Sequence, residues 1–235
     1  MKFSFGIITS IESKRYLKKV LRSIKNQHIP DEDYEILVVG GDEILKNEKI
    51  RFIRFDDNLK KGWITKKKNL ITEFSKFENI VFLHDYVALN NNWYDGFKKF
   101  GNDFSICMNK ITNYDYSRYR DWTLWTENNH ELDNILNKKN SECLIPYDIK
   151  HLSKFMYISG AYWVAKKNIM ESYPLNEDLA WGEGEDVEWS KRVRKYYNFD
   201  FNPFSKVKLL KYKDPIFTEP NNETLKLILS TTSNS

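Results

Sequence analysis

The segment at residues 79–87 constrains the fold more than any other part of this sequence. Its apolar run, Ile-Val-Phe-Leu at 80–83, is typical of a strand buried on both faces of a mostly parallel sheet. The run ends abruptly in His84 and Asp85. In open α/β sheets, ligands bind in the crevice beyond the carboxyl ends of the strands. A carboxylate there can hold a divalent metal and, through it, a phosphorylated ligand; polar turn residues that merely end a strand are the simpler alternative.

Strand and helix patterns alternate through the first hundred residues. Alternating or continuous apolar patterns predict strands at 3–9, 34–39, 51–55 and 79–85, and apolar residues at helical spacing predict helices from Ser13 to about 28 and over 64–77. This order indicates an α/β fold with a mostly parallel central sheet and right-handed crossovers. We therefore expect residues 1–90 to form a Rossmann-like nucleotide-binding half.

The second half of the chain is less regular. Helices are expected at 93–100, up to 173 and over 185–196, and strands at 104–109, 156–164 and 206–210. Residues 112–154 show no clean periodicity and are rich in polar and aromatic side chains, as expected of a functional or mobile insert. We expect one domain over 1–220, with 91–220 as the acceptor half, and a frayed tail at 221–235.

The composition and charge of the sequence argue against nucleic-acid binding and against a membrane-spanning protein. The net charge of +4 permits an anionic ligand or peripheral association with acidic lipid, but it does not favour nucleic acid, which would require a concentrated basic face. The run Lys66-Lys67-Lys68 is expected to be a solvated helix face. Cys107 and Cys143 have no metal-ligand spacing and are expected to be free thiols. With no signal-peptide pattern or membrane-span run, a cytoplasmic location is expected.

Two motifs, in order, carry a resemblance to a known family. They are Phe-Leu-His-Asp-Tyr-Val at 82–87 and Trp-Gly-Glu-Gly-Glu-Asp-Val-Glu-Trp-Ser-Lys-Arg-Val at 181–193, with Ser-Gly-Ala at 159–161 between them. Over residues 3–197 the sequence resembles the GT-A glycosyltransferases, close to the inverting family-2 type. The resemblance implies a GT-A fold and a nucleotide-sugar donor, which is most commonly a UDP-sugar.

The resemblance also implies a donor site. Thr9 and Asp42 would lie against the base, with Asp42 accepting the imide N–H of uracil; a turn residue after two glycines is the alternative for Asp42. Lys68 and Asn69 resemble an Arg-Asn pair that approaches the ribose and diphosphate, although lysine lacks the bidentate fork of arginine. The sugar would lie beneath Gly160.

The motif at 84–86 departs from the family's Asp-X-Asp metal motif, because only Asp85 remains as a carboxylate. We expect Asp85 to be the metal ligand for Mn²⁺ or Mg²⁺, held weakly and largely by the donor itself. His84 would serve as a further ligand or would orient a ribose or water. Independence of metal is the open alternative.

Glu185 and Asp186 match the acidic pair that begins the family's catalytic helix. A positioned carboxylate can take the proton of the acceptor hydroxyl as it attacks the anomeric carbon. Asp186 is the expected general base and Glu185 the expected holder of acceptor hydroxyls, with Glu183 as a rival base. Acids in a first helical turn are also favoured by the helix dipole alone.

Two aromatic or basic residues near these motifs have open roles. Trp181 could stack on a sugar ring or pack in the core. Arg120 lies in the segment at 118–122, which resembles a flap over donor and acceptor. It could compensate phosphate charge, or it could form a surface ion pair with Asp121.

The leading interpretation is therefore a glycosyltransferase that extends a glycan or glycolipid acceptor in polysaccharide biosynthesis. A catalytically degenerate protein that binds a nucleotide sugar or glycan is the main alternative. A sugar-phosphate nucleotidyltransferase is a weaker one, because residues 9–15 (Thr-Ser-Ile-Glu-Ser-Lys-Arg) lack the glycine-rich phosphate loop that such an enzyme needs.

Overall fold

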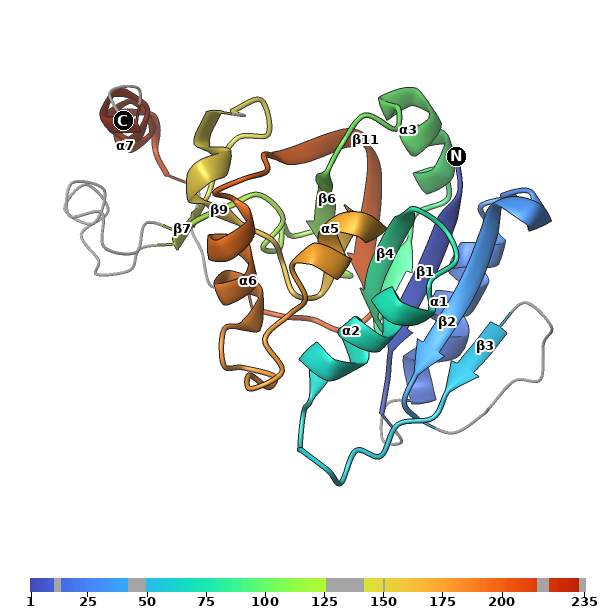
Figure 1. Cartoon of the computed structure of the whole chain (residues 1–235). Coiled ribbons are helices and arrows are strands. Elements are labelled where there is room, and N and C mark those ends of the chain that lie inside the picture. The colour runs from blue at the N-terminus through green and yellow to red at the C-terminus, as the bar shows by residue number, and fades with distance from the viewer. Residues whose placement is uncertain (11–13, 42–49, 126–141, 150, 215–219, 233–235) are drawn as a thin grey trace.

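A computed structural model describes residues 1–10, 14–41, 50–125, 142–149, 151–214 and 220–232 (Figure 1). Its centre is an eight-stranded sheet with the order β3-β2-β1-β4-β10-β6-β11-β5. The strands are β1 (Phe3–Ile8), β2 (Tyr34–Val39), β3 (Ile50–Ile53), β4 (Asn79–His84), β5 (Val87–Leu89), β6 (Ile106–Thr112), β10 (Tyr162–Lys166) and β11 (Phe199–Leu209). The sheet is mostly parallel, since only β10 and β5 run against their neighbours.

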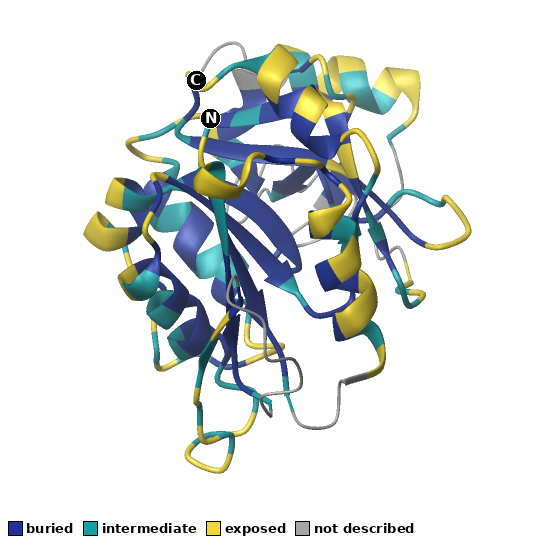
Figure 2. Cartoon of the chain, turned by 90° about the vertical axis from the view of Figure 1, so that its right-hand side faces the viewer, coloured by how far each residue is buried: buried dark blue, intermediate teal, exposed yellow. Residues whose placement is uncertain are grey.

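Helices cover both faces of this sheet. The strand side chains of Phe3 and Phe5 pack on Trp93 of α3 (Trp93–Phe100), and α1 (Lys14–Lys25) lies on the same face. On the other face Gly6 lies directly under Ile71 of α2 (Ile64–Phe74), and α2 contacts α5 (Lys167–Ser172). Figure 2 shows the result, with buried strands inside and exposed residues on the outer faces of the helices.

A smaller sheet stands beside the large one. It has the order β8-β7-β9, with β7 (Thr123–Trp125), β8 (Glu142–Leu144) and β9 (Met156–Tyr157). The 3-10 turn η3 (His151–Phe155) and helix α6 (Glu185–Val193) pack against it. The insert predicted without periodicity at 112–154 thus supplies two of the three strands of this smaller sheet, although residues 126–141 lie outside the described chain.

The sequence patterns located most elements but missed some boundaries. The strand expected at 156–164 is two strands in two different sheets, β9 and β10, separated by a turn at Ser159 and Gly160. The strand expected at 206–210 begins seven residues earlier, at Phe199. The segment 221–235, expected to be frayed, contains helix α7 (Asn222–Thr232), whose Ile228 is buried. No described helix is long and apolar enough to cross a membrane.

Candidate active site

The site is built where parallel strands β1 and β4 end side by side, with Ile8 paired to His84. Just beyond these ends, the Thr9 hydroxyl donates a 2.7 Å hydrogen bond to Asp85 Oδ2. Strand β10 runs the opposite way, so the turn that precedes it reaches the same edge, and the His84 amide donates to the Ala161 carbonyl at 3.1 Å. This is the edge at which open α/β sheets bind ligands.

Helix α6 points its first turn at the Ser159–Gly160 turn. The Gly160 amide donates to Asp186 Oδ2 at 2.8 Å, and the Val187 amide donates to Asp186 Oδ1 at 2.9 Å. Two backbone N–H groups therefore fix the direction of this carboxylate at the start of the helix. A side chain at Gly160 would not fit, because its Cβ would lie 2.8 Å from Glu185 Oε1 and 2.9 Å from Asp186 Oδ2.

Glu185 is buried beside a lysine of α2. Its Oε1 lies 3.6 Å from Lys68 Nζ, which also donates to the Gly160 carbonyl at 3.0 Å and lies 4.6 Å from the ring centre of Trp163. Lys68 is only 2% exposed. Burial lowers the pKa of Lys68 and raises the pKa of Glu185, while each charge partly offsets the shift of the other. The lysine run of α2 is thus not the solvated face that was predicted.

A pocket of about 560 Å³ opens in front of these groups. It brings together the end of β4, the small sheet, the turn before β10, the start of α6 and the segment after β11. Its lining includes His84, Tyr86, Tyr119, Arg120, Trp125, Tyr157, Ser159, Gly160, Ala161, Trp181, Glu185, Asp186 and Lys213. Two carboxylates and several aromatic rings therefore share one cavity with basic side chains.

Basic side chains stand at the same pocket as the two acids. Lys211 and Lys213 follow strand β11, with Nζ 4.0 and 5.0 Å from the ring centre of Tyr86. Burial, with help from Lys211 and Arg120, lowers the pKa of Lys213 to about 8. Burial and the charge of Lys68, followed by Lys213 and Lys211, hold the pKa of His84 well below its usual value. His84 is therefore neutral, in surroundings that favour an anion.

The described residues do not fit a divalent cation held by the protein. Asp85 is 4% exposed, accepts a hydrogen bond from Thr9 and is not among the residues that line the pocket. His84 does line it, but beside several cations. In the described part of the chain, no three His, Cys, Asp or Glu side chains come together as a possible metal site. The expected ligation of a metal by Asp85, with the donor supplying most of the other ligands, needs no such group of protein side chains and stays a prediction.

Several predicted donor-site residues lie behind or away from the pocket. Thr9 and Lys68 are buried beneath it, and Gly160 lines it. Asn69 lies elsewhere, since its side chain donates to the Leu175 carbonyl and accepts from the Leu175 amide. Asp42 lies outside the described residues. The structure thus gathers Glu185 and Asp186 with His84 and Gly160 but does not bring Asn69 to them.

The positions of Arg120, Trp181 and Glu183 decide between the alternative roles that the sequence left for them. Asp121 pairs with Arg118 at 2.7 Å, while Arg120 lines the pocket. Trp181 is 63% exposed at the pocket's edge, so it is not a core residue. Glu183, the rival base, accepts a hydrogen bond from the Ala180 amide and lines a neighbouring groove instead.

Sequence reasoning missed Lys211, Lys213 and Tyr157. The two lysines follow the end of β11, which runs parallel to β6 in the large sheet. His84 was selected because polar residues at the carboxyl end of a strand often bind ligands, and the same reasoning applies to these two lysines. They were passed over because the sequence placed the end of this strand but did not set it beside Tyr86 and His84.

No family model and no curated protein matches this sequence. Solved structures do match its fold. TarS of S. aureus (residues 1–349) aligns with a TM-score of 0.55 over 88% of this chain and 60% of that one, at 12% identity. The same fragment in complex with UDP-GlcNAc gives 0.57 over 99% and 66%, at 11% identity.

GalNAc-T7 with UDP, GalNAc and Mn²⁺ aligns with a TM-score of 0.65 over 99% of this chain and 48% of its own length, at 14% identity. The chain thus spans no more than two thirds of the length of these structures. All are glycosyltransferases, and the layered sheet and helices match theirs. The chain has the α/β fold of the GT-A glycosyltransferases.

Proposed function

We propose that this protein is a glycosyltransferase that moves a sugar from a nucleoside diphosphate sugar, most simply a UDP-sugar, to a hydroxyl acceptor with inversion. One observation carries the proposal. Two carboxylates at the start of α6 lie close to the backbone of Gly160, at the ligand-binding edge of the sheet, and share one pocket with basic side chains. That arrangement suits in-line displacement of a charged leaving group.

Asp186 acts as the general base in this proposal. The acceptor oxygen forms a bond to the anomeric carbon while the bond from that carbon to the diphosphate oxygen breaks. The acceptor proton passes to Asp186, whose two hydrogen bonds fix its direction. Glu185, held by Lys68, orients acceptor hydroxyls. The exposed indole of Trp181 supplies a face for a sugar ring.

The leaving diphosphate needs positive charge because it gains negative charge as the bond breaks. Arg120 and Lys213 line the pocket, and Lys211 lies beside it. In this proposal they bind the diphosphate and stabilise the charge that develops on it. No step depends on a metal ion, since Asp85 is buried against Thr9 and the pocket is rich in cations.

A thermal-shift screen of nucleotides and nucleotide sugars tests donor binding. A ligand that binds only the folded protein raises the melting temperature by mass action. We expect one UDP-sugar or its nucleotide to raise the melting temperature to the same extent with Mn²⁺, with Mg²⁺ and with EDTA. Stabilisation that requires metal would contradict the role given to the basic side chains, and no stabilisation by any nucleotide would contradict the donor class.

Donor binding without any release of nucleoside diphosphate would favour the alternative of a non-catalytic binding protein. Glu183→Gln tests the rival base. Release should fall far less than on loss of the Asp186 carboxylate, because Glu183 lines a neighbouring groove and not the pocket.

A further inference from the structure

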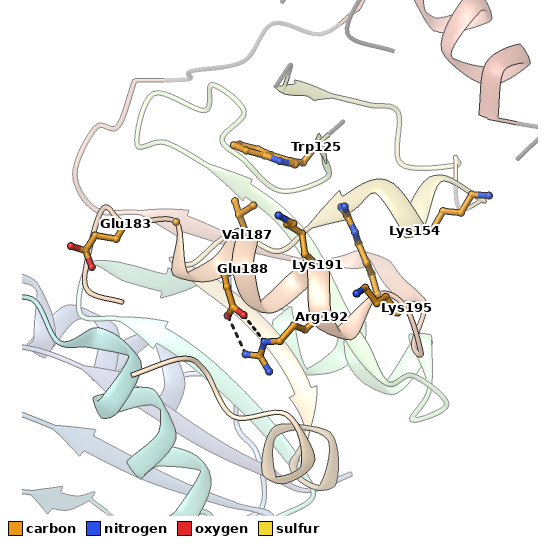
Figure 3. Close-up of a pocket in the computed structure, with 10 residues that line it drawn as sticks. Trp125, Lys154, Glu183, Val187, Glu188, Lys191, Arg192 and Lys195 are labelled. Atoms are coloured by element: carbon orange, nitrogen blue, oxygen red, sulfur yellow. Dashed lines mark hydrogen bonds and ion pairs between the residues drawn. The ribbon is translucent and has the colours of Figure 1, made fainter. Parts of the chain in front are cut away.

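A second hollow lies next to the active-site pocket along the outer side of α6. It has a volume of about 720 Å³ and is bounded by α6 on one side and by β7 and η3 on the other (Figure 3). We call it the basic groove, after the cationic side chains that line it: Lys154, Lys191, Arg192, Arg194 and Lys195.

Two of these five cations, Lys154 and Lys195, carry charge that no described carboxylate pairs with. Arg192 pairs with Glu188 at 2.6 Å, and Glu183 lies at the opposite end from Lys154 in Figure 3. Lys154 and Lys195 are exposed, and neither has an ion-pair partner in the part of the chain that the structure describes. The groove therefore has a surplus of cations at the end away from the catalytic pocket.

The helix dipole alone does not explain this surplus. Basic residues in the last turn of a helix are favoured by the dipole, which accounts for Lys191 and Arg192. Lys154 belongs to a different element, η3, yet it faces the same groove. Convergence of cations from separate elements on one hollow indicates a ligand with negative charge.

The basic groove is continuous with the active-site pocket. Trp125, Gly184 and Val187 line both. Trp125 packs edge-on against Tyr157, with ring centres 5.8 Å apart, and so forms an aromatic wall where the two hollows meet. A chain that enters the pocket with one hydroxyl beside Asp186 can therefore continue along the groove.

We propose that the basic groove binds the body of the acceptor, and that this acceptor is an anionic glycan whose units carry carboxylate or phosphate groups. The assignment rests on the proposed transferase function, because it places the acceptor hydroxyl at Asp186. Repeated negative charges would meet Lys154, Arg194 and Lys195, while sugar rings would contact Trp125.

Fluorescence anisotropy with three labelled probes of similar length tests this proposal: a polygalacturonate oligosaccharide, inorganic polyphosphate and a neutral maltooligosaccharide. The test variant is Lys154→Gln with Lys195→Gln. The matched control is Lys18→Gln with Lys19→Gln, which removes the same charge from the exposed face of α1. All four lysines are exposed, so both variants should fold, and melting temperatures check this.

We expect the native protein to bind both anionic probes, and the groove variant to bind them roughly tenfold more weakly. The control variant should stay within about twofold of the native protein, and the neutral probe should bind weakly to all three. Equal weakening by both variants, or no weakening by the groove variant, would overturn the proposal. Phosphatidylglycerol vesicles serve as a fourth probe. If the groove variant binds these vesicles more weakly than the native protein but binds the glycan probes equally well, the groove binds a membrane surface and the proposal is overturned.

The thermal-shift screen with nucleotide sugars distinguishes failure of the groove proposal from failure of the proposed transferase function. The groove variant should show the same thermal shift with the nucleotide sugar as the native protein. Groove-dependent binding of anionic probes by a protein that binds no nucleotide would overturn the acceptor role together with the proposed function, while leaving the groove as a glycan site.

Discussion

The close approach of Gly160 to the two carboxylates of α6 allows a test that adds one methyl group. In Gly160→Ala the new Cβ would lie 2.8 and 2.9 Å from oxygens of Glu185 and Asp186. Ordinary contact begins near 3.4 Å, so each oxygen must withdraw by about half an ångström. A misplacement of about 1 Å can cost on the order of a hundredfold in rate. We therefore expect kcat/KM to fall by at least roughly tenfold, which is about 1.4 kcal/mol of transition-state stabilisation.

The assay is release of UDP from the donor that the thermal-shift screen identifies, measured beside the melting temperature and the donor affinity. Gly101→Ala is the control, because nothing lies within 4 Å of its new methyl group. Its φ of 96° is unfavourable for alanine, so this substitution should lower the melting temperature without changing the rate of the folded protein. A folded Gly160→Ala protein with the native rate would refute the placement of both carboxylates.

Two further predictions follow from the buried and basic groups. Lys68→Met leaves Glu185 buried without its partner, so unfolding free energy measured in urea should drop by about 3–5 kcal/mol, and adding Glu185→Gln should restore much of it; a drop below about 1 kcal/mol would argue against a buried pair. The pKa of Lys213, about 8, means that this side chain is charged at pH 7 and mostly neutral at pH 9. Donor affinity by calorimetry should therefore fall roughly tenfold over that range, and Lys213→Gln should abolish the dependence; a pH dependence that survives the substitution would contradict the diphosphate role.

The fold of the first half, residues 1–90, was predictable because its elements obey simple periodicity. The run at 80–83 is buried as β4, with its neighbours β1 and β2 parallel to it. The fold class follows from the order of these elements. The helix predicted from 185 was also confirmed, with its acids in its first turn.

The second half was harder because local patterns there conflict with tertiary context. The apolar residues around Ser159 and Gly160 continue a strand pattern, yet the chain turns there to bring Gly160 to Asp186. Pro203 interrupts β11 at an irregularity between Asn202 and Lys206, and this concealed the first part of the strand.

The residues of α2 show a different limit. A basic run usually indicates a solvated face, but Lys67 and Lys68 are buried, and Lys67 pairs with Asp57 at 2.5 Å. Their partners are ten or more residues away in sequence, so no local pattern could reveal them. Lys68 was placed beside a diphosphate by resemblance, whereas the structure places it beside Glu185.

The central claim is that Asp186 takes the proton of the acceptor hydroxyl, and Asp186→Asn tests it most directly. The amide keeps the size of the side chain and can still accept the hydrogen bond from Gly160, but it cannot act as a base. Because general-base catalysis contributes on the order of a hundredfold to ten-thousandfold, sugar transfer measured as UDP release should fall by about that factor while the donor-induced thermal shift stays unchanged. Native turnover by Asp186→Asn, or donor binding without turnover in the native protein, would contradict the account.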